Sequence, residues 1–276
     1  MRAEVGLGVE LCVSRTVRDT AGLLDAVRGP GIGDTVIAPT PQRPYIEEVG
    51  ANPGRLRIGL LDVHPRGDFL HEDCVSAVRA VASMLDDLGH IVEPAWPVCL
   101  ADATLPRKFM ALWATQMAMA ARGFSETLGR EVTADDIEPV NWVLVEQAQR
   151  LTAVDYAVAQ AAGWAFRRAL QQWWADGWDL LLTPTVAEPP LLLTEFENNP
   201  DHPTAPMRRA GQFAAFTPAF NMSGQPAISL PLHRNADGLP IGVQLAAAYS
   251  REDVLIRIAA QLESAHPWLS DHPPIS

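Results

Sequence analysis

One serine beside a glycine and a single lysine are the residues of this chain best suited to covalent chemistry. Ser223 precedes Gly224 in the stretch NMSGQP, and Lys108 is the only lysine. Covalent catalysis by a serine hydroxyl needs a base that activates it and, in acyl transfer, N–H donors where the oxyanion forms. Ser223 has no basic neighbour in the sequence. Since a solvated lysine is more common than a catalytic one, we predict no catalytic residue in this chain.

Tryptophans crowd the middle of the chain and suggest either a core or the wall of a binding pocket. Ligand sites are mostly apolar with a few polar groups. Trp113 and Gln116 stand one helical turn apart, so both would face the same space. They are our candidates for substrate binding, although packing between helices and a sheet is the more ordinary interpretation of these tryptophans: Trp113, Trp142, Trp164, Trp173, Trp174 and Trp178.

Metal and cofactor sites are not predicted. The seven histidines lack H-x-x-x-H or H-E-x-x-H spacing, and we expect surface or capping roles for them. The glycines of 29–33 lead into proline-rich coil, whereas a phosphate-binding loop would lead into a helix. Cys12, Cys74 and Cys99 are too scattered for a disulfide framework, so we expect reduced thiols.

Charge and hydropathy exclude two classes of partner. The net charge of −12 disfavours binding to nucleic-acid phosphates. A transmembrane helix needs about 18 or more consecutive apolar residues, and none is present; the first residues also lack the apolar region of a secretory signal. We therefore expect a cytoplasmic, globular protein with no nucleic-acid or membrane partner.

Hydrophobic periodicity predicts alternating strands and helices. Short apolar runs indicate buried strands, and residues recurring every three to four positions indicate helices. A hairpin turn is expected at Asp237-Gly238, where positive φ angles are needed. The pattern predicts an α/β fold with a mixed β-sheet flanked by helices on both faces. Strands are expected over 56–62, 90–94, 179–183, 227–232 and 241–247, and helices over 17–28, 73–88, 101–122, 133–149, 154–175 and from 250 onward, with loops at 30–54 and 123–130.

The stretch from Phe216 to Ala246 resembles the C-terminal hallmark of the amidase signature family. The likeness rests on NMSGQPAISLP followed by GLPIGVQL, and three other segments agree in order: SRTVRD at 14–19, LRIG at 56–59 and DLLLTPT at 179–185. The resemblance implies an enzyme that hydrolyses carboxylic amides to acid and amine. We interpret Gly224, Pro226 and Gly242 mainly as scaffold, with Gly242 admitting a neighbouring backbone. Asn221 is our third candidate for substrate binding.

The family's Gly- and Ser-rich catalytic segment has no counterpart in this chain. In the family that segment carries the nucleophilic Ser and a cis-Ser, with a Lys further upstream. We therefore expect residues 1–276 to form a single amidase-family domain that is incomplete on its N-terminal side and inactive alone. A small-molecule amide would be its substrate if an N-terminal catalytic segment complemented it. The alternatives are a non-catalytic interaction module, a subunit of a multi-part amidase or amidotransferase in a homo- or hetero-oligomer, or a misplaced start codon.

Overall fold

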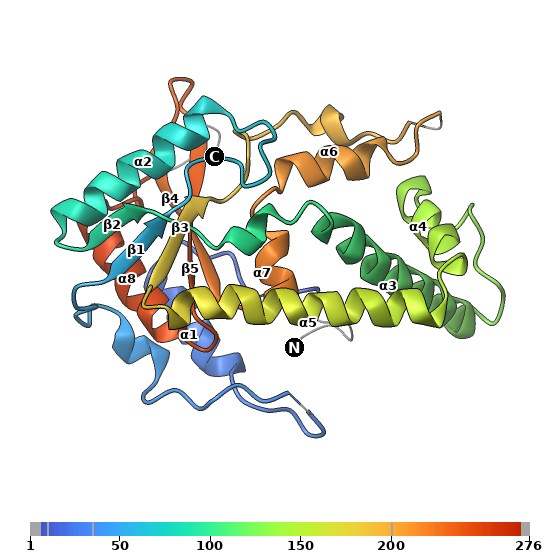
Figure 1. Ribbon diagram of the computed structural model, residues 1–276, viewed down its shortest axis with the longest axis horizontal. Coiled ribbons are helices and arrows are strands. Elements are labelled where there is room, and N and C mark those ends of the chain that lie inside the picture. Colours follow the sequence, from blue (N-terminus) through green and yellow to red (C-terminus); the bar gives the residue numbers. More distant parts are fainter. Residues whose placement is uncertain (1–6, 10, 35, 200, 272–276) are drawn as a thin grey trace.

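A five-stranded mixed sheet organises the chain (Figure 1), in the order β2-β1-β3-β5-β4. The computed structural model describes residues 7–9, 11–34, 36–199 and 201–271. Parallel pairing joins β1 to β2 and to β3, and antiparallel pairing joins β5 to β3 and to β4. The strands are β1 (Arg57–Leu60), β2 (Ile91–Pro94), β3 (Leu180–Pro184), β4 (Ala227–Arg234) and β5 (Pro240–Ala247).

One face of the sheet is covered by α2 (Glu72–Asp87), α8 (Glu252–Ala265) and α1 (Val17–Val27). The apolar stripes predicted for these helices meet the alternate side chains of β4 and β5 in one core. The 3₁₀ turn η1 (Tyr45–Glu48) packs against α1 and α8. The unit β1-α2-β2 is the βαβ crossover that the sequence predicted.

The other face is covered by α5 (Ala153–Ala175) and the short α7 (Pro218–Ser223). Leu181 of β3 and Ala246 of β5 meet Leu170 and Trp174 of α5 in a second core. Helix α3 (Leu105–Leu128) packs on α5 and α4 (Pro139–Gln149) packs on α3, so these helices extend away from the sheet (Figure 1). The expected mixed sheet with helices on both faces is confirmed.

Three short elements connect the layers: η2 (Val98–Ala101), η3 (Leu193–Phe196) and α6 (Ala205–Phe213). Arg209 of α6 binds both Glu188 and Glu195, with Nη1 at 2.6 Å and Nε at 2.8 Å from their carboxylates. This ion-pair group secures the proline-rich segment that follows β3.

Two helix boundaries differ from the prediction. Helix α3 continues through Gly123 to Leu128 and ends at Gly129, whose φ of 67° suits a helix C-terminus. The expected loop at 123–130 is therefore wrong for most of its length. Helix α4 starts at Pro139, six residues later than expected, because Asp136 instead closes a turn with Thr133 and Arg130.

Two helices are not capped by the first residue of the ranges predicted for them. His71, and not Asp73, caps α2, since His71 Nδ1 accepts the Asp73 N–H at 3.1 Å. Ser250 caps no helix; α8 begins after Arg251 with no side-chain cap. Only Gly238 of the hairpin pair has a positive φ, of 78°, and Asn235 orders the turn by accepting the Asp237 and Leu239 N–H groups.

Strand β4 forms one edge of the sheet in the described part of the chain. Its inner face buries Leu230 and Leu232, whereas Ala227, Ser229 and Pro231 are exposed on the other face. A proline within a strand is found essentially at edges because it cannot donate to a neighbour. Strand β4 therefore presents an exposed edge.

Candidate active site

Ser223 and Lys108 lie apart from any partner that could activate a nucleophile. Ser223 ends α7, where its Oγ is buried and its hydrogen bond goes to the Phe220 carbonyl at 3.5 Å. Lys108 Nζ lies 3.5 Å from Asp102 at the start of α3. The pKa of Asp102 is lowered, first by hydrogen bonds from Thr104 and then by this lysine. Among the described residues no serine hydroxyl bonds to a lysine or histidine.

Trp113 lies half-buried on α3 and borders the second core. Its ring stacks on Phe109 with centroids 5.6 Å apart and planes 20° from parallel, so its orientation is restricted. The indole N–H is buried and has no hydrogen-bond partner in the described part of the chain. Gln116 is half-buried one turn further along the same helix. Trp113 therefore packs as a core residue and still offers an unused donor.

Asn221 lies on α7 and holds the N-terminal segment in place. Its Nδ2 donates to the Leu7 carbonyl at 2.7 Å, and Leu7 is only 2% exposed. Gly224 follows α7 with a φ of 81°, the left-handed conformation that a non-glycine residue resists. The first half of the stretch NMSGQP is thus the end of a short helix. A helix this short has no distinctive sequence pattern, because its stability comes from packing on α5.

Three strands contribute a row of polar side chains to the face of the sheet that carries the second core. Thr185 and Ser229 share a hydrogen bond between their hydroxyls at 2.6 Å. A Cβ added at Gly242 would lie 2.9 Å from each of these hydroxyls. The glycine therefore admits two side chains, not the neighbouring backbone that we expected. Next along the row, Gln244 donates to the Thr183 hydroxyl at 3.0 Å.

The sequence analysis missed this polar row, although a signal for it was present. Ser229 pairs with Gln244 across the hairpin, and Thr183 pairs with Gln244 on the other side. Directly opposed residues in a sheet point to the same face, so a correct hairpin register would have grouped the three side chains. The row accepts and donates hydrogen bonds without any charged group in it.

Two histidines that we expected at the surface are buried. His90 Nδ1 accepts the Leu56 N–H at 3.1 Å, and its Nε2 contacts Gln261 Oε1 at 2.9 Å. His64 accepts the N–H groups of Arg66 and Asp68, and burial lowers its pKa. Both are structural links. No group of three or more metal-ligating side chains occurs within the described ranges.

The three cysteines of the described part are free thiols. Burial raises the pKa of Cys74 to about 12 and that of Cys99 to about 11, so neither thiol is activated. Cys12 is exposed, and all three are unpaired, as predicted.

None of the described helices combines the length and apolar character that crossing a bilayer requires.

The sequence is related to known hydrolases over nearly its whole length. The model of the family described as Amidase matches residues 2–256. Two 6-aminohexanoate-cyclic-dimer hydrolases, from Pseudomonas sp. (strain NK87) and Paenarthrobacter ureafaciens, are each 40% identical over 276 residues. These alignments include 98% of this chain and 56% of each relative. The chain thus spans about half the length of the curated relatives it matches.

The fold agrees with this relationship. A solved structure of 6-aminohexanoate cyclic dimer hydrolase superposes with a TM-score of 0.88 at 39% identity. The superposition covers 95% of this chain and 55% of that one. The same helices and strands are therefore present in one part of a longer enzyme.

Proposed function

Because this chain belongs to the amidase family, we propose that it forms the part of a carboxylic amide hydrolase that borders the substrate, while another polypeptide segment supplies the nucleophile. One observation carries this proposal: the alignments take in 98% of this chain but only 56% of each relative. The isolated serine and lysine described above support the same division of roles. In this proposal the chain alone does not hydrolyse amides.

The proposed substrates are neutral amides with methylene segments, such as cyclic amides of 6-aminohexanoate. The relatives that share 40% of this sequence are named for the cyclic dimer of that acid. Such a substrate presents apolar methylenes and amide groups but no charge, so an uncharged site of aromatic and carboxamide groups suits it. The polar row of Thr183, Gln244 and Ser229 carries no charge either.

Trp113, Gln116 and Asn221 are the residues that we propose to contact the substrate. Trp113 would supply an apolar wall, and its unpaired buried N–H could donate to an amide carbonyl. Asn221 uses Nδ2 to hold Leu7, which leaves Oδ1 to accept an amide N–H. Gln116 offers a half-buried carboxamide one turn from Trp113.

The edge of β4 is the proposed docking surface for the complementing segment. An unpaired edge strand is a template for a further strand. Near the other end of the chain, Val9 and Leu11 are 58% and 45% exposed and Val13 is fully exposed. The unpaired edge of β4 and these exposed side chains also favour a second candidate function. In it the chain is a non-catalytic subunit of a larger assembly, whose partner covers β4 but brings no nucleophile.

Complementation distinguishes these functions. The chain is purified alone and also after coexpression with the part of the Paenarthrobacter ureafaciens enzyme that it does not match, and hydrolysis of the 6-aminohexanoate cyclic dimer is measured. We expect turnover only from the complemented sample. A fluorophosphonate probe should label a serine of the added segment only. Turnover by the chain alone, or a labelled serine on it, would overturn the proposal, and a stable inactive complex would favour the second candidate.

Substitutions in the complemented enzyme test the contact residues. Trp113→Phe and Gln116→Ala should raise KM several-fold with a smaller change in kcat, because ground-state contacts are lost. Trp164→Phe is the matched control, since this ring is 51% exposed on α5 and should leave KM unchanged. Equal KM values for Trp113→Phe and Trp164→Phe would remove Trp113 from the site.

A further inference from the structure

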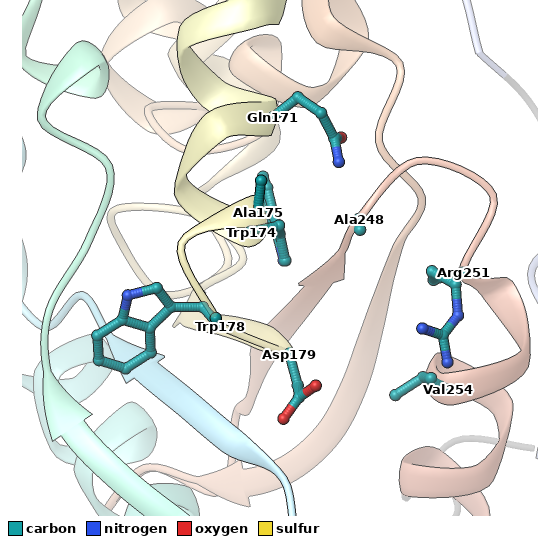
Figure 2. Close-up of a pocket in the computed structure, with 9 residues that line it drawn as sticks. Gln171, Trp174, Ala175, Trp178, Asp179, Ala248, Arg251 and Val254 are labelled. Carbon is teal, nitrogen blue, oxygen red and sulfur yellow. The ribbon is translucent and has the colours of Figure 1, made fainter.

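A hollow of about 270 Å³ opens beside the first residues of the central strand β3 (Figure 2). Thr185 lies at the opposite end of the same strand, just after its last residue. The hollow lies among the end of α5, the turn before β3, the residue after β5 and the start of α8. Its volume is below the roughly 300 Å³ at which pockets for drug-sized ligands begin, so its ligand would be small.

Arg251 supplies a cationic group on one side of this hollow. Its Nε and Nη2 bind the Asp253 carboxylate at 2.8 Å and 3.2 Å. This pairing fixes the guanidinium plane and leaves Nη1 without a hydrogen-bond partner in the described residues. A guanidinium with one side held and one free is suited to binding a second carboxylate.

Asp179 supplies an anionic group on the neighbouring side. Its Oδ2 accepts the Arg57 N–H at 2.8 Å, which leaves Oδ1 free within the described ranges. Asp179 and Arg251 line the same hollow without forming an ion pair with each other. Figure 2 shows them on separate elements around one open space. Each charge is therefore held in place by another residue and remains open to a ligand.

Gln171 supplies a further donor at the hollow. Gln171 Oε1 accepts hydrogen bonds from Gln225 Nε2 at 3.1 Å and from the Tyr249 N–H at 3.2 Å. These bonds determine which end of the amide is nitrogen, and Figure 2 shows that nitrogen pointing into the space. Trp174 is 5% exposed and closes the hollow on the side of the second core.

We propose that this hollow binds a small zwitterionic amino acid, with its carboxylate on Arg251 and Gln171 and its ammonium group on Asp179. The unused groups are two donors, on Arg251 and Gln171, and one carboxylate oxygen of Asp179, which match a ligand with an anionic end and a cationic end. An anion alone would meet the repulsion of Asp179 and Asp253, and an amine alone would leave the donors unpaired. This inference does not depend on the proposed amide hydrolysis, because none of the residues that line the hollow is among those proposed to contact the amide.

Ligand-observed NMR with the full chain tests the proposal. The probes are glycine, 4-aminobutanoate and 6-aminohexanoate, which differ in the distance between their charges, together with acetate and butylamine, which carry one charge each. At least one amino acid should bind about tenfold more tightly than both singly charged probes, the discrimination that one charge-assisted hydrogen bond supplies. Equal binding of all probes, binding of butylamine alone, or no binding at millimolar concentration would overturn the proposal.

Three variants locate the binding. Asp179→Asn keeps an acceptor for the Arg57 N–H, and Arg251→Gln keeps a polar side chain beside Asp253, so both should fold. Each should weaken amino-acid binding at least about tenfold. Arg130→Gln removes the guanidinium of an exposed pair with Asp136 on the α3–α4 connection and should bind like the parent chain. Equal affinity of all three variants would exclude this hollow, and circular dichroism verifies that each is folded.

Discussion

Glu48 accepts a hydrogen bond from Nε of Arg257 at 2.5 Å, across 209 positions of the chain. Arg43 completes the group, with Nε and Nη2 at 2.7 Å and 2.6 Å from the same carboxylate. Glu48 is only 2% exposed. The long segment between α1 and β1 is thereby joined to α8.

Glu48→Gln should destabilise the protein strongly. The substitution leaves two arginines beside a neutral amide, and removing one partner of a buried ion pair costs about 3–5 kcal/mol. Because Arg43 remains partly exposed, we expect about 3 kcal/mol, measured by urea denaturation. Glu93→Gln is the matched control, because Glu93 pairs with Arg57 while 46% exposed. That change should cost less than about 1 kcal/mol, and equal losses in the two variants would contradict the assigned role.

The same carboxylate predicts how stability depends on pH. Hydrogen bonds from Arg43, and next in weight from Arg257, lower the pKa of Glu48 to about 2 despite its burial. Because the folded pKa lies below the unfolded value of about 4.3, this contribution is fully present above pH 4.3 and is lost as the pH falls toward 2. The stability difference between the parent chain and Glu48→Gln should therefore narrow from pH 6 to pH 3. A constant difference across this range would argue against the lowered pKa.

Gly242→Ala should separate the two hydroxyls above it. The added methyl would lie 2.9 Å from Thr185 Oγ1 and from Ser229 Oγ. Overpacking of this kind costs about 1–3 kcal/mol. Adding Ser229→Ala should restore part of the loss, because it removes one of the atoms that the methyl meets. Gly123→Ala is the control: nothing lies within 4 Å of its added Cβ, and a helix interior gains about 0.5–1 kcal/mol from alanine. Equal effects at the two glycines would refute the steric argument.

Ser250→Gly should stabilise the protein. Ser250 has a φ of 63°, the one positive value among the described non-glycine residues, and its buried hydroxyl has no partner in those ranges. A left-handed non-glycine residue costs about 1–3 kcal/mol, so we expect a gain of about 1 kcal/mol and a higher Tm. A loss of stability would mean that the hydroxyl has a role that the described residues do not account for.

Asn221→Ala should release the segment around Leu7. Its Nδ2 contact with the Leu7 carbonyl ties α7 to residues 214 positions away. Without it, hydrogen exchange in residues 7–9 and 11–14 should accelerate by about fivefold, corresponding to one lost hydrogen bond of about 1 kcal/mol. Unchanged exchange in these residues would mean that Asn221 does not hold the segment, and substrate contact would be its remaining proposed role.

Local periodicity was sufficient to predict most elements of the fold. The helix expected over 154–175 is α5, which begins at a capping box of Thr152 and Asp155, and the apolar run of β3 is buried at every position. Errors arose where local signals competed. Gly123 was read as a loop residue, but it lies on the open side of a long helix, where its missing side chain removes no contact. His71 replaced Asp73 as the α2 cap because an imidazole nitrogen also accepts an N–H.

The sequence by itself determined the family and the sheet with helices on both faces, because these follow from short-range patterns and from residue types. Only the tertiary structure decided that Thr185 meets Ser229 across Gly242, that Glu48 binds Arg257, and that Asp179 and Arg251 share a hollow. The physical reason is that each of these relationships joins segments distant in the chain. Such contacts depend on strand register and helix docking, which no local pattern encodes.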